Sequence, residues 1–206
     1  MRIAINVFIG LTFFLSGTLK AVNVYSFAQT INSFCGLLGL SGIYGCGTFL
    51  AIVICTIEYL LPLLSLSDRY KDVVIWTYPV VLGYFTYITF INYTDPYGGI
   101  ESCGCFGEVV HFSPAASFYK NVILLGLSLL LLAARYVAQD KAFKPGFPII
   151  SVDGYLCVAL LASIAPPLFS FLCLNKMPHT AYLVTFIALC VVSIGVCILI
   201  AKRKPL

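Results

Sequence analysis

Six apolar blocks, each about 20 residues long, dominate this sequence and limit what it can fold into. A helix needs about 20 mainly apolar residues to cross the hydrocarbon core of a bilayer. The composition agrees, because 61% of the 206 residues are hydrophobic and only 10% are charged, which excludes an ordinary water-soluble domain. We predict an all-α, polytopic membrane helical bundle. Its predicted spans are residues 3–19, 48–67, 73–91, 115–137, 155–174 and 180–201.

The basic residues indicate how such a bundle is oriented. Six spans place both termini on one side, and nine of the 12 Lys and Arg residues then fall on that side. Only Lys20, Lys120 and Lys176 fall on the other. Because cytoplasmic loops are enriched in Lys and Arg, we predict that both termini are cytoplasmic. A cleaved signal peptide in place of the first span would leave five spans and remove this charge pattern.

The net charge of +4 does not predict a nucleic-acid partner. The basic residues are spread over short loops and form no stripe with aromatic residues between them. The lipid bilayer is the partner that the composition itself predicts.

The nine cysteines fall into two groups by position. Five lie inside apolar blocks, where a free thiol behaves as a small hydrophobic group, and we interpret them as packing residues. The other four lie in segments 20–47 and 92–114, which the predicted topology places outside the membrane, where disulfides form and persist. These four are interpreted first as redox groups. The packing cysteines are Cys55, Cys157, Cys173, Cys190 and Cys197.

The most specific motif is Cys103-Gly104-Cys105, followed by Gly107. Two thiols one residue apart can close a disulfide only where the backbone turns sharply, and the glycines permit the required dihedral angles. Such a ring is strained and exchanges readily, which suits a catalytic pair. Two alternatives remain open. The segment could be an inert turn, or the two thiols could bind a metal ion together with His111.

Cys35 and Cys46 lie in the other outer segment. A second pair facing Cys103 and Cys105 would act as a relay that exchanges with a soluble partner and passes electrons to the membrane pair. The alternative is structural: Cys35 follows apolar residues at helical spacing between positions 27 and 34, and Cys46 would simply begin the second span.

Glu58 lies near the middle of the second span, where a carboxylate must be protonated or meet a partner. On the first span, Ser16 and Lys20 are four residues apart and so share one face of a helix. Lys20 is the expected counter-charge of Glu58. We predict that the three residues either handle a proton or hold the two helices together.

The Ser-Gly-x-x-Lys ending of the first span (residues 16–20), the lone Glu58 and the Ser-Cys-Gly-Cys-Phe-Gly sequence at 102–107 occur in an order that resembles the MauE branch of the DoxX-like membrane proteins. The resemblance covers residues 1–138 and implies a four-helix core in a bacterial inner (plasma) membrane. It also implies a link to methylamine utilisation, through maturation of a disulfide-rich dehydrogenase subunit. The outline is similar to vitamin K epoxide reductase, but those enzymes use Cys-x-x-Cys.

Three predicted parts follow from the spans and the resemblance: a MauE/DoxX-like core (1–138), a cytoplasmic linker (139–154) and a two-helix transmembrane hairpin (155–206). We predict a thiol–disulfide exchange or disulfide-maturation factor whose cysteine loop lies on the periplasmic side. The expected partner is a periplasmic thioredoxin-like protein or a disulfide-containing client. No cofactor is predicted, and a quinone is conceivable but lacks a supporting motif. The alternative is a non-enzymatic assembly, metal-binding or transport protein with a structural cysteine loop.

Overall fold

The structure, a computed structural model, describes residues 2–37, 39, 45–94, 113–138 and 153–202, and all regular structure in these ranges is helical. Six of the helices are long and apolar enough to cross a membrane, and α2 is the exception. The polytopic helical bundle is therefore confirmed. The elements are α1 (Arg2–Ala21), α2 (Val24–Leu37), α3 (Gly47–Ser65), α4 (Lys71–Thr94), α5 (Pro114–Ala138), α6 (Gly154–Cys173) and α7 (His179–Lys202).

Helix α2 is the main departure from the prediction, which treated residues 20–47 as a loop with one amphipathic turn. The six spans begin and end within three residues of their predicted limits, but this segment folds as a 14-residue helix. Its buried side chains include Phe27, Ile31 and Cys35, spaced every fourth residue along one face. Ser33 and Gln29 lie on the exposed face. Helix α2 is too short to span a bilayer. Its apolar stripe packs against α3, and this packing explains why the segment is helical.

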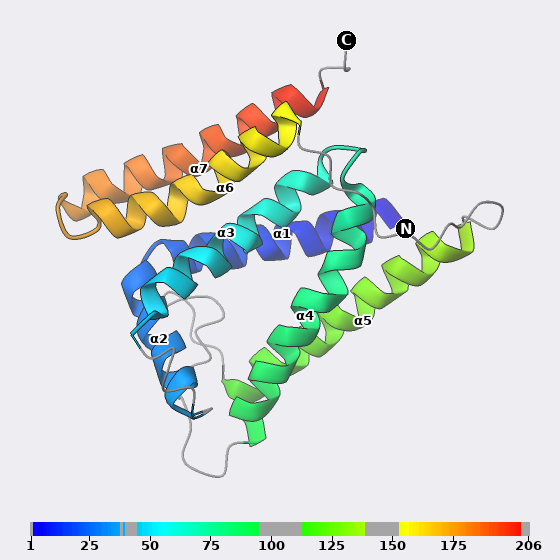
Figure 1. Cartoon of the computed structure of the whole chain (residues 1–206), viewed down its shortest axis with the longest axis horizontal. Helices are drawn as coiled ribbons and strands as arrows, with labels where there is room; N and C mark the ends of the chain where they lie inside the picture. The colour runs from blue at the N-terminus through cyan, green and yellow to red at the C-terminus, as the bar shows by residue number, and fades with distance from the viewer. Residues whose placement is uncertain (1, 38, 40–44, 95–112, 139–152, 203–206) are drawn as a thin grey trace.

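The helix ends gather at two opposite sides of the bundle (Figure 1). One side carries α2, and we call it the α2 side. The opposite side carries the start of α1 and the end of α7, and we call it the terminal side. This alternation of ends is what six consecutive spans require. Helices α1, α3, α6 and α7 run alongside one another, whereas α4 and α5 pair and cross them at a steep angle (Figure 1).

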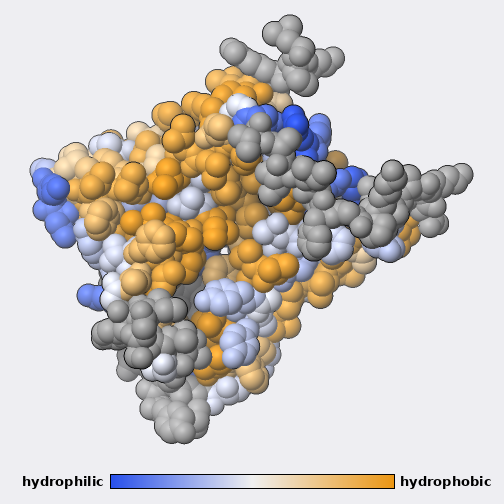
Figure 2. Space-filling model, viewed as in Figure 1, coloured by the Kyte–Doolittle hydropathy of each residue, from blue (hydrophilic) through white to orange (hydrophobic). Residues whose placement is uncertain are grey.

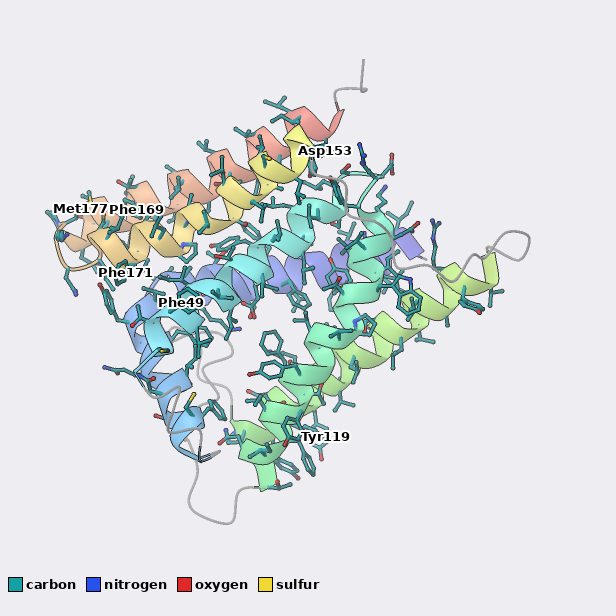
Figure 3. All side chains as sticks on the ribbon, viewed as in Figure 1. Phe49, Tyr119, Asp153, Phe169, Phe171 and Met177 are labelled. Carbon is teal, nitrogen blue, oxygen red and sulfur yellow. The ribbon has the colours of Figure 1, made fainter. Side chains whose placement is uncertain are left out.

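The α6–α7 hairpin packs against the rest of the bundle through tyrosine hydroxyls that donate to backbone carbonyls. Tyr182 donates to Val22 O at 2.7 Å, and Tyr155 donates to Leu63 O. Phe169 stacks on Tyr182 with ring centroids 5.6 Å apart. Figure 3 shows Phe169, Phe171 and Met177 at the α2 side of the hairpin and Asp153 at the terminal side. The predicted linker falls on residues 139–154, most of which lie outside the described ranges.

The lateral surface of the bundle is apolar, as a lipid-facing surface must be (Figure 2). Exposed residues along α7 include Val184, Val191 and Leu199. Polar residues gather at the two ends, which leaves an apolar belt between them (Figure 2). One packing prediction is wrong, because the thiol of Cys157 is exposed and faces outward from α6 and not into the core. An apolar block allows a cysteine on either face, and only helix packing decides which.

Candidate functional site: a buried lysine–glutamate pair

A buried ion pair joins α1 to α3. The ammonium of Lys20 donates to Glu58 Oε1, and the two side chains are 4% and 1% exposed. Ser16 Oγ lies 3.4 Å from the same carboxylate oxygen. The structure thus brings together the three residues that the sequence predicted would meet. A lone charge at this depth would be expensive, and pairing is the arrangement that makes both groups tolerable.

Two aromatic rings complete the surroundings of Lys20. Its ammonium lies 5.1 Å from the ring centroid of Phe27 on α2 and 4.9 Å from that of Phe85 on α4. Both distances are within the range of a cation–π interaction, which strengthens when the cation is removed from water. Lys20 is therefore the point at which four helices meet: α1, α2, α3 and α4.

Gly17 allows this approach of α1 to α3. A Cβ atom at Gly17 would lie 3.1 Å from the Cβ of Glu58, tighter than an ordinary van der Waals contact. The Ser-Gly-x-x-Lys sequence therefore has a structural explanation: Ser16 and Lys20 supply donors to the carboxylate, and Gly17 supplies the space beside it.

A small cavity of about 30 Å³ adjoins the pair. Glu58 Oε2 has no hydrogen-bond donor among the described residues, although the atom is buried. The volume and the polar lining meet the requirements of a site for about one water molecule. The polar side chains that line the cavity come from α1, α3 and α5, and they are Thr12, Ser16, Lys20, Glu58, Lys120 and Asn121.

The sequence analysis missed a second buried polar contact, between α4 and α5. Asn121 Nδ2 lies 3.2 Å from Thr89 Oγ1 and 3.3 Å from Phe85 O, and both polar side chains are nearly fully buried. Asn121 also lines the cavity beside Glu58. A polar amide inside a predicted span was the signal that could have identified it.

Aromatic residues hold the end of α4 to the start of α5. Tyr93 stacks on Phe118 with ring centroids 5.5 Å apart and an angle of 3° between planes, and Phe90 contacts the same ring at 5.7 Å. Tyr119 lies beside them (Figure 3). These helix ends flank the segment that carries the predicted cysteine pair, so both ends of that segment are anchored on the α2 side.

The predicted loop residues themselves, Cys103, Gly104, Cys105 and Gly107, lie outside the described ranges, as does His111 of the alternative metal site. Within the described ranges, no group of three His, Cys, Asp or Glu side chains could hold a metal ion.

Cys35 and Cys46, the predicted relay pair, are both free thiols in different environments. Cys35 is buried on the apolar face of α2, and Cys46 is exposed at the N-cap position of α3. Helix α2 and the start of α3 are in close contact. There is no room for a side chain at Gly47, where an added Cβ atom would lie 2.6 Å from Ala28 O. Both cysteines are therefore on the α2 side, together with the anchors of the segment 95–112.

Comparison with known proteins gives one family match and one local match. The family model described as methylamine utilisation protein MauE matches residues 1–134, which include α1 to α4 and most of α5. Over 62 residues the chain is 32% identical to Protein TlpB of Flavobacterium psychrophilum, a match that covers 30% of this chain. The chain spans only 16% of the length of that curated relative. No solved structure matches.

Proposed function

Because this chain belongs to the family of methylamine utilisation protein MauE, as the match over residues 1–134 shows, we propose that it is a thiol–disulfide exchange or disulfide-maturation factor. It is a multi-pass membrane protein, and we place its active cysteines, Cys103 and Cys105, on the periplasmic face of a bacterial inner membrane. The excess of Lys and Arg on the terminal side supports this orientation, with both chain termini in the cytoplasm.

One observation carries the proposal: the segments that lead into all four non-span cysteines converge on the α2 side. Cys35 lies on α2, Cys46 begins α3, and α4 and α5 hold the two ends of the segment that contains Cys103 and Cys105. The described residues on either side of segment 95–112 thus lie on the same side as Cys35 and Cys46. On the periplasmic side that we propose, cysteines favour disulfide chemistry over packing.

The exchange step transfers two electrons. A client thiolate attacks one sulfur of the Cys103–Cys105 disulfide, which breaks that bond and forms a mixed disulfide. A second client thiolate then attacks the mixed disulfide, so the client is oxidised and both thiols of this chain are reduced. The Cys35–Cys46 pair, in its disulfide form, would reoxidise them by the same two attacks. A thioredoxin-like protein of the periplasm, in its disulfide form, would then oxidise Cys35 and Cys46 by the same exchange and become the dithiol that carries the two electrons away. The reverse sequence reduces the client.

We assign Glu58 the role of a buried proton acceptor in this exchange, with Lys20 and Ser16 as the groups that position it. Its second oxygen adjoins the cavity and lacks a donor among the described side chains, whereas the first accepts from Lys20 and Ser16. Each thiol must lose a proton before it can attack, since the thiolate is the nucleophile. Protonation of Glu58 leaves the ammonium of Lys20 as the remaining charge, and the rings of Phe27 and Phe85 still contact that cation.

The test is to trap thiols in native membranes with acid and to label them with a maleimide, in wild type and in the Cys103→Ser and Cys105→Ser variants. We expect a reversible Cys103–Cys105 disulfide in wild type and a mixed disulfide with another protein in one of the two variants. Cys157→Ser is the matched control, because it removes an exposed thiol on α6 that the mechanism does not use. Two reduced thiols that accept label only after a chelator is added would contradict exchange and favour a metal-binding assembly protein.

A further inference from the structure

A groove of about 630 Å³ lies on the terminal side, between the ends of α1, α3, α4 and α5. We call it the terminal groove. Its volume is within the range of protein sites that bind small ligands. It is separate from the Lys20–Glu58 pair, since Lys20 lies at the α2-side end of α1, whereas Ile3 and Val7 line the groove at the other end of that helix.

Two helices line the terminal groove with the same pattern, a cation at the helix end and an apolar side chain one turn deeper. On α4 these are Lys71 and Ile75, and on α5 they are Arg135 and Leu131. Residues four apart share one face of a helix, so each pair presents both groups to the groove. The groove is therefore cationic at its rim and apolar toward the bilayer.

Helix α1 lines the third side of the terminal groove with apolar residues that are exposed in the described structure. Ile3 and Val7 are 82% and 52% exposed. Both belong to a membrane-spanning helix, so lipid and not water is their natural neighbour. Between them, Asn6 Oδ1 is buried and has no hydrogen-bond donor among the described residues. The α1 side thus offers apolar surface and one polar acceptor.

Asp68 and Asp72, the acids that pair with the two cations, are not among the residues that line the groove. Lys71 pairs with Asp68, whose side chain is 94% exposed, and such surface pairs are weak. Arg135 Nη2 donates to Asp72 Oδ2 at 2.9 Å, and the arginine side chain that lines the groove is still 39% exposed. An accessible guanidinium is well suited to a phosphate, because its planar fork can bind two oxygens.

We propose that the terminal groove binds an anionic glycerophospholipid. Lys71 and Arg135 bind its phosphate, and an acyl chain lies along Ile3, Val7 and Ile75. The two-layer pattern, a charged rim above an apolar wall, matches the two chemical parts of a lipid whose headgroup is at the end of the spans. Basic pockets between membrane helices recognise anionic headgroups in this way. The inference is independent of the proposed thiol chemistry.

The test uses the full chain in detergent micelles, titrated with phosphatidylglycerol or phosphatidylcholine of the same acyl chains and observed by native mass spectrometry. We expect retention of phosphatidylglycerol over phosphatidylcholine. Lys71→Gln and Arg135→Gln should each weaken phosphatidylglycerol binding roughly fivefold, the factor that corresponds to about 1 kcal/mol per basic residue near a membrane surface. Lys71→Arg, which keeps the charge, should retain it. Lys176→Gln is the control, an exposed cation in the α6–α7 turn on the α2 side.

A second variant separates the site from general charge attraction. Val7→Trp adds bulk to the apolar wall at a side chain that is 52% exposed, and we expect it to reduce phosphatidylglycerol retention while leaving both cations in place. Val184→Trp makes the same kind of change on the exposed face of α7 and should have no effect. Equal retention of the two lipids, or equal losses in Lys71→Gln and Lys176→Gln, would overturn the proposal. Thermal unfolding of each variant in the same detergent establishes that it is folded.

Discussion

The interior and the terminal side of this bundle hold their charges in opposite ways. Between α1 and α3, Lys20 and Glu58 form a pair whose side chains are 4% and 1% exposed. On the terminal side, Arg135 and Asp72 form a pair whose side chains are 39% and 44% exposed. An ion pair therefore contributes differently to the stability of the fold in the two places. An exposed pair contributes little to stability, whereas a buried pair is costly to break.

The buried pair raises the question of why Lys20 and Glu58 are charged at all. Replacing both members of such a pair with well-packed apolar residues is often neutral or stabilising, so burial alone does not explain why Lys20 and Glu58 are charged. A role in the chemistry, or in fixing how α1 and α3 meet, explains it better. Changing one contact in each place tests this difference between the buried and the exposed pair.

The largest effect is expected from Glu58→Leu, which removes the carboxylate from the buried ammonium of Lys20. We expect a loss of about 3–5 kcal/mol in the free energy of unfolding, the cost of a broken buried pair. Reversible unfolding in mixed micelles measures it. Arg135→Gln on the terminal side is the matched control, and its change should stay within about 1 kcal/mol.

The double variant Lys20→Met with Glu58→Leu distinguishes the two roles of this pair. We expect most of the lost stability to return, because neither charge is then unpaired. If the pair handles a proton, thiol–disulfide exchange should remain slow in this stable variant. Normal exchange in the double variant would instead assign the pair a purely structural role.

Gly47→Ala is expected to have an intermediate effect, because it tests the packing of α2 against α3. An added Cβ atom would lie 2.5 Å from Asn32 Oδ1 and 2.6 Å from Ala28 O, and the backbone oxygen can move only if the helix moves. We expect a loss of about 1–3 kcal/mol, typical of overpacking. The same substitution at Gly126 on α5 meets nothing within 4 Å and should stabilise by up to about 1 kcal/mol. Equal effects at the two positions would contradict the close contact.

The smallest effect is expected at Asp153, on the terminal side. Burial tends to raise the pKa of this carboxyl, but hydrogen bonds from Leu156 N and Tyr70 OH and the charge of Arg69 outweigh it, so the pKa is lowered from its usual value. Such a group stabilises the fold above its ordinary pKa of about 3.9 and loses that contribution as the pH falls through the lowered value.

Asp153→Asn tests this assignment, because asparagine still caps α6 but carries no charge. Thermal unfolding of both proteins from pH 7 to pH 3 should show wild type as the more stable at neutral pH. The difference should begin to shrink as the pH falls toward about 3.9 and below. A constant difference across this range would show that the carboxylate charge is not involved.

Much of this architecture could be predicted without coordinates. The six spans follow from length and hydropathy, because a bilayer demands about 20 apolar residues per crossing. Lys20 and Glu58 could be identified as partners because charges inside spans seldom remain alone. Helix α2 was harder to predict, since its stripe is short and its limits carry no charged residues. A helix of this length depends on the surface it packs against.

Other contacts depend on how helices distant in sequence cross. Thr89 and Asn121 could be recognised as polar residues in apolar spans, but their mutual contact requires α4 and α5 to pair in one register. The same holds for the closeness of Gly47 to α2, which no local pattern reveals.

The number of spans, the alternation of their ends and the presence of charges that must be paired within the membrane follow from the sequence alone. These follow from the cost of exposing polar groups to hydrocarbon, which acts on each segment separately. Only the tertiary structure decided which faces meet. It placed Lys20 between Phe27 and Phe85 and left Cys157 on the lipid-facing surface. Packing depends on two helices together, whereas hydropathy can be calculated for each helix alone.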